Sequence, residues 1–371
     1  MKTVIIIPTY NESESIKTTI EGLQREFKKI KGHQMHILVF DSNSTDDTQK
    51  IVKNLQKKYK NLHLQTEKEK SGLGGAYIKA MRYAMDKMAV DAVFEYDADG
   101  SHQPKYIPGM VKALEKGADV VVGSRYIPGG KMPADWGIDR KLISYFGNFI
   151  ARAVLFTPQY KDMTSGFRGT KTKFLKKIDL ENLLCKQFAY KIHLYYALHK
   201  LRAKIVEYPI EFIDRGKGKS KFPKNNIKDS LKVVFTLRLR ESQQFLKFCV
   251  VGLVGYIINA SGLAIFASLG FVEWLIWALS TEMAIISNFT LNNLWTFKAK
   301  KITGLAIIKK FLQFNLTSAG ALLIQTVAGT IGTYILGPQY RQLLLPFIVV
   351  FLVLPYNYFM YTKVIWKTGR K

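Results

Sequence analysis

The sequence predicts two domains of different class: an α/β domain with a mostly parallel sheet, and after it an all-α membrane domain of four transmembrane helices. Three observations support this prediction. Short apolar runs alternate with amphipathic segments up to about Arg240, as in parallel strands joined by helical crossovers. Long apolar runs take over from Phe245 onward. With 371 residues, the chain is also too long for one ordinary hydrophobic core.

The predicted α/β domain contains five short strands separated by helices. Apolar runs predict the strands at residues 4–7, 37–40, 62–64, 92–96 and 120–122. Ser13 can cap a first helix, whose apolar positions Ile16, Ile20, Leu23 and Phe27 have helical spacing. Further helices are predicted at about residues 46–59 and 72–88.

Polar residues follow the strands at the points where they end. Residues 8–12 follow the first strand, Asp41 the second, Asp97 and Asp99 the fourth, and residues 123–125 the fifth. Open α/β sheets bind ligands outside the carboxyl ends of their strands, so these residues predict a nucleotide site. Considered alone, Asp41 equally fits a helix-capping turn, and the acidic pair fits a solvated turn.

The acidic pair predicts a divalent cation. Asp97 and Asp99 are one residue apart, which places their side chains on the same side of an extended backbone. Carboxylate oxygens are hard ligands that suit Mg²⁺ or Mn²⁺ bridging to a diphosphate.

The formal net charge of +27 indicates an anionic partner. Nucleic acid, phospholipid head groups and phosphorylated substrates all fit the charge alone. The basic segment 217–240 has one acidic residue, Asp229, and adjoins the apolar runs. No nucleic-acid-binding module is recognisable, so we expect membrane lipids and no nucleic acid as partners. The apolar spacing at residues 227, 231 and 234 predicts amphipathic interface helices at residues 223–243.

Four apolar runs predict the membrane spans, at residues 245–269, 272–293, 311–336 and 343–364. Lysines lie between the second and third runs and after the fourth, whereas the other two connections hold only Arg341. The positive-inside rule then places the α/β domain and both chain ends in the cytoplasm. The short apolar run at the N-terminus does not resemble a signal peptide, and two cysteines exclude a disulfide scaffold, in agreement with that location. Glu282 lies deep in a span and is expected to face neighbouring helices or a water-filled cavity.

Four segments resemble the inverting glycosyltransferases of family two, which have the Rossmann-like GT-A fold. They are Ile6-Ile7-Pro8-Thr9-Tyr10-Asn11-Glu12, Asp41-Ser42-Asn43-Ser44-Thr45-Asp46, Asp97-Ala98-Asp99 and Gly123-Ser124-Arg125. Later segments are similar to polyprenyl-phosphate sugar synthases of the dolichol-phosphate mannose synthase type. These are residues 139–144 with Asn148, residues 162–168 and residues 214–221. The pattern Phe245-Leu246-Lys247-Phe248 recurs as Phe311-Leu312-Gln313-Phe314, which indicates a duplicated helical hairpin. Two duplicated hairpins resemble GtrA-like membrane domains, and the resemblance rests on Ser287-Asn288-Phe289 and Asn292-Asn293-Leu294-Trp295-Thr296-Phe297.

The resemblance implies a role for each matching residue. The nucleotide sugar would contact Pro8, Tyr10, Glu12, Val39, Asp41, Asp97, Ala98, Asp99, Arg125, Arg215 and Lys221. Asp99 would ligate the metal, Asp97 would contact the nucleotide or metal-bound water, and Ser101 would be a weaker ligand. Arg140 and Ser144 would orient the acceptor phosphate, so the catalytic set is Asp97, Asp99, Arg125, Arg140 and Ser144.

The chemistry fits a phosphate acceptor. A hydroxyl acceptor needs a general base, whereas a phosphate monoester with a second pKa of about 6 arrives as a nucleophilic dianion. The expected mechanism is direct in-line displacement at the anomeric carbon, with inversion. The sequence has no Gln-x-x-Arg-Trp motif of processive polymer synthases, which favours a single transfer.

The expected arrangement is a GT-A domain at residues 1–222, interface helices at 223–243 and a GtrA-like domain at 244–371. The expected reaction moves mannose from GDP-mannose to dolichyl (polyprenyl) phosphate with Mg²⁺ or Mn²⁺. One alternative is a UDP-glucose:polyprenyl-phosphate glucosyltransferase. Another, of a different class, is a lipid-linked sugar flippase or scaffold with an inactive transferase domain.

Overall fold

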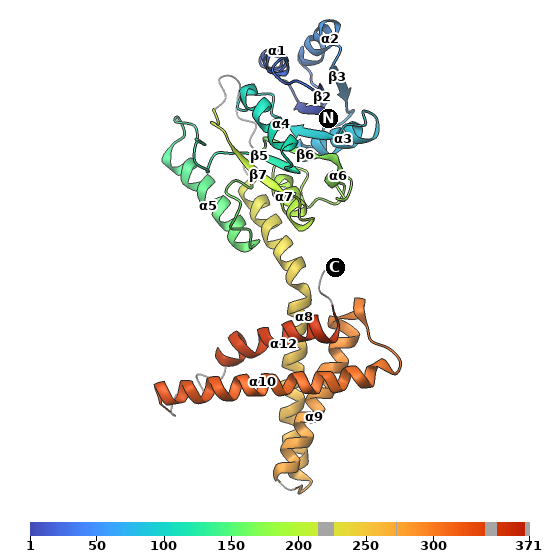
Figure 1. Ribbon diagram of the computed structural model, residues 1–371, viewed down its shortest axis with the longest axis vertical. Coiled ribbons are helices and arrows are strands. Elements are labelled where there is room, and N and C mark those ends of the chain that lie inside the picture. The colour runs from blue at the N-terminus through green and yellow to red at the C-terminus, as the bar shows by residue number, and fades with distance from the viewer. Residues whose placement is uncertain (214–225, 272, 338–346, 368–371) are drawn as a thin grey trace. The chain divides into compact units, whose positions relative to one another are not determined.

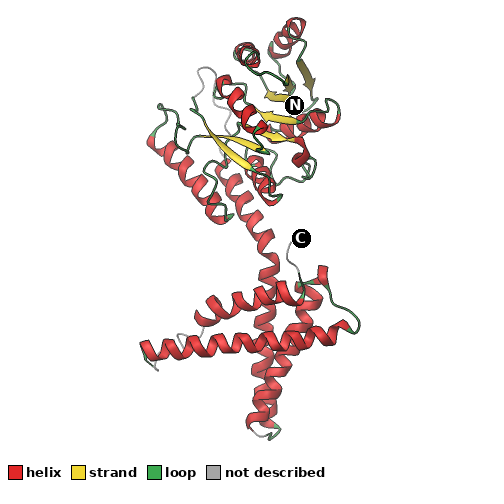
Figure 2. Ribbon diagram, viewed as in Figure 1, coloured by secondary structure: helices red, strands yellow, loops and turns green. Residues whose placement is uncertain are grey.

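The computed structural model describes residues 1–213, 226–271, 273–337 and 347–367. By its packing the chain divides into two compact units, residues 1–238 and residues 239–371. The first unit contains the sheet, and the described part of the second unit is helical (Figure 2).

The first unit is built on a seven-stranded, mostly parallel sheet with the order β3-β2-β1-β4-β6-β5-β7. All strand pairs are parallel except those that β6 makes with β4 and β5. The mostly parallel α/β prediction is therefore confirmed. The strands are β1 (Lys2–Thr9), β2 (Gln34–Asp41), β3 (Leu62–Thr66), β4 (Ala92–Glu95), β5 (Val120–Ser124), β6 (Arg168–Lys171) and β7 (Ile205–Pro209).

Helices cover both faces of the sheet because its central strands are apolar on both sides. In β1, Val4 and Ile6 enter one buried cluster while Ile5 and Ile7 enter the other, which is the two-residue period of a strand. One face packs against α1 (Ile16–Phe27), α2 (Thr48–Lys58) and α4 (Ile107–Glu115), and the other against α3 (Leu73–Asp86) and α7 (Tyr190–Lys200) (Figure 1).

Two strands were not predicted, and neither were the helices between residues 89 and 213, which include α4, α7 and one long helix. The short strand β6 begins with Arg168 and lacks an apolar run, and β7 is only partly buried. The helix α5 (Ile138–Val154) buries only Asn148 and Ala151 and exposes six large apolar side chains. These exposed residues are Ile138, Leu142, Ile143, Tyr145, Phe146 and Phe149.

The second unit contains helices at each of the four apolar runs. The helix α8 (Asn226–Ser268) begins in the first unit, where Val233, Val234 and Leu237 join its core, and continues into the second. It is followed by α9 (Glu273–Leu291), α10 (Ala306–Leu336) and α12 (Leu354–Met360), with π-helical turns at Asn292–Thr296, Val349–Val353 and Tyr361–Ile365. By length and composition, one helix of the described ranges, Asn226–Phe266, is long and apolar enough to cross a membrane.

The internal sequence repeat is visible in the packing of the second unit. Phe248 and Phe314 occupy the same position in the repeated pattern, and both are buried in one aromatic cluster. Each ring contacts the ring of Tyr361, at centroid distances of 5.5 and 4.3 Å. The two equivalent phenylalanines therefore share Tyr361 as a neighbour, and the contact of Phe248 with Tyr361 joins the first repeat to the second.

Candidate functional site

The sheet topology brings the predicted polar segments to one edge. Strands β1, β2, β4 and β5 run in the same direction, so residues 8–12, Asp41, residues 97–99 and Arg125 all lie at its carboxyl edge. Because β6 runs the opposite way, its first residue and the preceding segment 162–167 reach this edge as well.

The acidic pair follows β4 directly. The Tyr77 hydroxyl donates to Asp97 Oδ1 over 3.0 Å, and the Asp97 amide donates to Nδ1 of His102 over 3.0 Å. Asp99 Oδ1 accepts bonds from the amide and the hydroxyl of Ser101, at 3.1 and 2.6 Å. Ser101 is buried, whereas both carboxylates are partly exposed, so the pair is accessible to a ligand.

His102 supports this loop as a neutral imidazole. Its ring stacks on Phe167 and is buried, and the hydroxyl of Tyr96 donates to its carbonyl oxygen. Burial lowers the pKa of His102. Because Nδ1 accepts the Asp97 amide, the proton of the neutral ring resides on Nε2, which lies 3.7 Å from Asp97 Oδ2.

The donor set of the acidic pair fits Mg²⁺ or Mn²⁺. Asp97, Asp99 and Ser101 offer only hard oxygen atoms, and these cations commonly use one or two carboxylates together with substrate phosphates and water. Within the described ranges no group of three or more His, Cys, Asp and Glu side chains could hold a metal ion.

Asp41 is fully buried and holds the turn after β2. Its oxygens accept four bonds: from Thr9 Oγ1 at 2.9 Å, from the amide and hydroxyl of Ser44 at 2.9 and 2.5 Å, and from Gln49 Nε2 at 2.6 Å. Four bonds use the acceptor capacity of a carboxylate. A nucleoside would have to replace one of these donors to bond with Asp41.

The other predicted nucleoside residues surround this turn. Pro8, Tyr10 and Glu12 are partly exposed in the segment after β1, and the Lys70 ammonium lies 3.7 Å from the centre of the Tyr10 ring. The side chains of Val39 and Ala98 are buried, so they can shape the floor of a site only from beneath.

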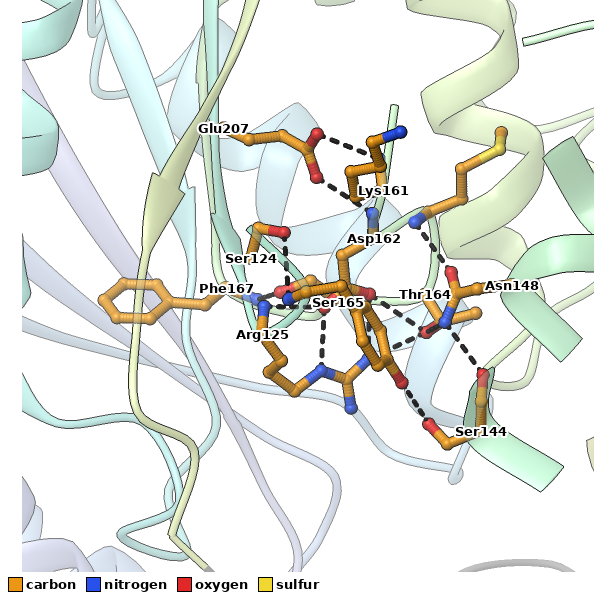
Figure 3. Close-up of polar contacts among 12 residues, drawn as sticks. Ser124, Arg125, Ser144, Asn148, Lys161, Asp162, Thr164, Ser165, Phe167 and Glu207 are labelled. Carbon is orange, nitrogen blue, oxygen red and sulfur yellow. Dashed lines mark hydrogen bonds and ion pairs between the residues drawn. The ribbon is translucent and has the colours of Figure 1, made fainter. Parts of the chain in front are cut away.

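Arg125 is held in place by Asp162 (Figure 3). Arg125 Nε and Nη2 donate to the two oxygens of Asp162 at 2.7 and 2.8 Å, and Nη2 also donates to Thr164 Oγ1 at 2.9 Å. Burial opposes the charge of Arg125, but Asp162 more than compensates, so the pKa of the guanidinium is raised. These bonds use Nε and Nη2, and within the described ranges Nη1 makes no hydrogen bond, so its two protons can serve a ligand.

The two predicted acceptor residues lie on α5. Ser144 Oγ is 2.6 Å from the hydroxyl of Tyr126, and the Arg140 guanidinium lies 3.9 Å from the centre of the Trp136 ring. Asn148, one turn after Ser144, links this helix to Thr164 over 3.0 Å (Figure 3). A pocket of about 220 Å³ beside them is lined by Tyr126, Tyr145, Asn148, Arg152 and Lys161.

Two predicted residues, Arg215 and Lys221, lie outside the described residues. Sequence reasoning gave no role to four residues that the structure places around the acidic pair and Arg125: Tyr77, His102, Asp162 and Lys191. Only two of them could have been noticed in the sequence: Asp162 begins the segment 162–168 named above, and His102 follows Ser101.

Comparison with known proteins finds a family match for each of the two halves of the chain. Residues 4–179 match the family model described as glycosyl transferase family 2, and residues 247–366 match the GtrA/DPMS transmembrane domain. The chain therefore combines a glycosyltransferase domain with a membrane domain.

Three curated relatives carry the names of mannosyltransferases that act on polyprenyl phosphates. A dolichol-phosphate mannosyltransferase from Pyrococcus furiosus is 31% identical over 330 residues, which are 88% of this chain and 89% of the relative. An undecaprenyl-phosphate mannosyltransferase from Micrococcus luteus is 36% identical over 60% of this chain and 87% of its own. A polyprenol monophosphomannose synthase from Mycolicibacterium smegmatis is 32% identical over 62% and 84%, respectively. The protein belongs to the family 2 glycosyltransferases of the dolichol- and polyprenol-phosphate mannosyltransferase group.

Proposed function

We propose that this protein transfers mannose from GDP-mannose to dolichyl or another polyprenyl phosphate, yielding the lipid-linked sugar and GDP. One observation carries the proposal: the chain aligns with the Pyrococcus mannosyltransferase over both of its halves. The carboxyl edge of the sheet supports it, because oxygen ligands and a fixed guanidinium face the same region.

The departing diphosphate requires positive charge. Mg²⁺ or Mn²⁺, held by Asp99 with Asp97 and Ser101, would supply part of that charge when bound. Arg125 supports the same task through its Nη1 protons, and we assign Arg215 and Lys221 to the diphosphate as well.

We assign the acceptor phosphate to Arg140 and Ser144 on α5. Because a phosphate monoester is already an anionic nucleophile at neutral pH, these residues need only bind and orient it. Direct attack at the anomeric carbon then inverts its configuration. The exposed apolar side chains on the same helix suit an acceptor whose isoprenoid tail stays in a lipid phase.

We assign the nucleoside to the turns after β1 and β2, with Pro8, Tyr10 and Glu12 at its rim and Val39, Asp41 and Ala98 beneath it. The exposure of the first three residues and the burial of the others support this division. Exchange of the Gln49 or Ser44 bond would free Asp41 for the nucleoside.

For the domains we propose a GT-A domain at residues 1–222, amphipathic interface helices at 223–243 and a GtrA-like domain at 244–371 with four transmembrane helices. The match of residues 247–366 and helices at the four apolar runs support this arrangement. The distribution of lysines supports a multi-pass membrane protein whose catalytic domain and both ends are cytoplasmic.

A parallel donor assay tests the proposal. The purified full-length chain is incubated with Mn²⁺ and a polyprenyl phosphate, with radiolabelled GDP-mannose in one series and UDP-glucose in the other. We expect label to enter the lipid phase from GDP-mannose and to require the polyprenyl phosphate. Transfer from UDP-glucose alone would replace the donor, and no transfer from any nucleotide sugar would favour the flippase or scaffold.

A further inference from the structure

A buried lysine lies directly behind the acidic pair. Lys191 is on α7, and its side chain is 1% exposed. Its ammonium makes no hydrogen bond to any residue in the described ranges, yet lies 3.9 Å from Asp97 Oδ2. Burial of an ammonium without a partner is strongly unfavourable, so a lysine at this position requires the nearby carboxylate.

The surrounding structure fixes Lys191 in place. The Arg168 guanidinium donates to the Lys191 carbonyl oxygen over 3.2 Å, and the hydroxyl of Tyr190 donates to Glu95 at the end of β4. These bonds anchor the start of α7 to β4 and β6. The Lys191 ammonium also lies 4.4 Å from the centre of the Phe188 ring, within the range of a cation–π contact.

Gly166 leaves the space that the ammonium occupies. A Cβ atom at this position would lie 2.0 Å from Lys191 Nζ and 3.4 Å from Asp97 Oδ2. A side chain at residue 166 would therefore displace the lysine. The segment before β6 thus passes close to both the lysine and the carboxylate.

The two carboxylates of the pair have different surroundings. Asp97 receives a bond from Tyr77 on Oδ1, while Oδ2 faces the Lys191 ammonium and His102 Nε2. Asp99 Oδ1 accepts bonds from the amide and the hydroxyl of Ser101. The Lys191 ammonium therefore lies beside the Asp97 carboxylate and offsets its charge.

We propose that Lys191 is a positioning residue: it aims Asp97 and offsets its charge, so that the acidic pair binds a divalent cation weakly until a diphosphate is present. The cation and the sugar nucleotide then bind as a pair, because the diphosphate supplies the negative charge that Lys191 offsets. This inference rests on the proposed function, in which Asp97 and Asp99 face the cation.

The test is Lys191→Met, which removes the charge and keeps the length of the side chain. Free Mn²⁺ is measured by electron paramagnetic resonance in the absence of sugar nucleotide, with the full-length protein in detergent. We expect the Kd for Mn²⁺ to fall about tenfold, because the substitution removes a positive charge that repels the cation. The transfer rate should fall about 100-fold, because Asp97 is no longer aimed.

The matched control is Lys173→Met, since Lys173 pairs with Asp119 at the amino edge of the sheet. It should change neither quantity. Gly166→Ala is a second variant that keeps the charge but displaces it, and it should tighten Mn²⁺ binding by a smaller factor. A general loss of structure would weaken Mn²⁺ binding, which is the opposite direction.

The outcomes separate the two proposals. If the wild type binds Mn²⁺ and both variants bind it equally well, the inference about Lys191 is wrong and the proposed function stands. If the wild type binds no Mn²⁺ with or without GDP-mannose, the cation site and the inference both fail.

Discussion

Arg125 and Asp162 form a two-point ion pair in which the carboxylate is completely buried, with N–O distances of 2.7 and 2.8 Å. The pair joins the end of β5 to the segment before β6, and Glu207 holds that segment through the amides of Lys161 and Asp162 (Figure 3). Because both Asp162 oxygens are used, the guanidinium is held in one orientation before any ligand arrives. A guanidinium that is fixed in this way is preorganised, which is what a positively charged group needs in order to stabilise a departing diphosphate.

Asp162→Asn tests this role. The amide keeps the shape but leaves the Arg125 charge unpaired, and loss of one partner of a buried pair costs about 3–5 kcal/mol. We expect the melting temperature of the full-length protein in detergent to fall by roughly 6–20 °C. Asp119→Asn, which removes the partner of the exposed Lys173, is the control and should shift it little. Equal melting temperatures of Asp162→Asn and Asp119→Asn would contradict the role of Asp162 as the buried partner of Arg125.

A second buried ion pair lies beneath the acidic pair. Arg168 and Glu95 are each 1% exposed and approach to 2.6 Å, so Arg168→Met alone should lower the melting temperature by a similar amount. Combined with Glu95→Leu, the same substitution should recover a large part of the loss, because no charge is then left unpaired. Additive losses in the double variant would show that the two residues act independently.

The pH dependence of stability has a specific source in Glu67. Burial opposes its ionisation, but bonds from Lys79, Ser42 and Ser71 prevail and lower its pKa to about 2. Because the folded pKa lies below the ordinary value of about 4.3, the contribution is complete above that value. It is lost as the pH falls toward 2.

Glu67→Gln should therefore melt below the wild type at pH 6, and the difference should shrink steadily by pH 3. Thermal melts across this range measure the difference directly. A difference that stays constant with pH would mean that the Glu67 charge does not contribute to stability.

Glu282 on α9 accepts a bond from Asn315 on α10 over 3.4 Å. This agrees with the expectation that Glu282 faces a neighbouring helix. Polar contacts between membrane helices contribute about 0.6 kcal/mol on average. We expect Glu282→Ala and Asn315→Ala each to lower the melting temperature by about 2 °C, and the double variant to lose no more than either alone. Fully additive losses would show that the bond contributes nothing.

The apolar runs were sufficient to predict the first five strands. Residues 4–7 are buried on both faces of their strand, and a strand of this kind needs an unbroken apolar run, which can be recognised in the sequence. The strand β6 gave no such signal because it begins with a charged residue, Arg168. This arginine can be buried because Glu95 on β4, 73 residues earlier in the chain, neutralises its charge. Pairing of this kind depends on the tertiary structure and leaves no local pattern.

The same distinction applies to the site. The placement of Asp97, Asp99 and Arg125 at one edge could be predicted because each lies within a few residues of a strand end, and parallel strands bring their ends together. Lys191 could not, because a lysine on a helix usually faces solvent, and only the packing of α7 against Gly166 places it beside Asp97. Arg215 and Lys221 lie outside the described residues, so the roles predicted for them remain predictions.

The most direct test of the central claim is the rate at which labelled mannose passes from GDP-mannose to a polyprenyl phosphate, measured for the wild type and for Asp99→Asn. We expect the wild type to lose transfer when a chelator is added and to recover it with Mn²⁺. We expect Asp99→Asn to remain folded and to transfer at least about 1000-fold more slowly at every Mn²⁺ concentration. Full transfer by Asp99→Asn, or by the wild type in excess chelator, would contradict the account.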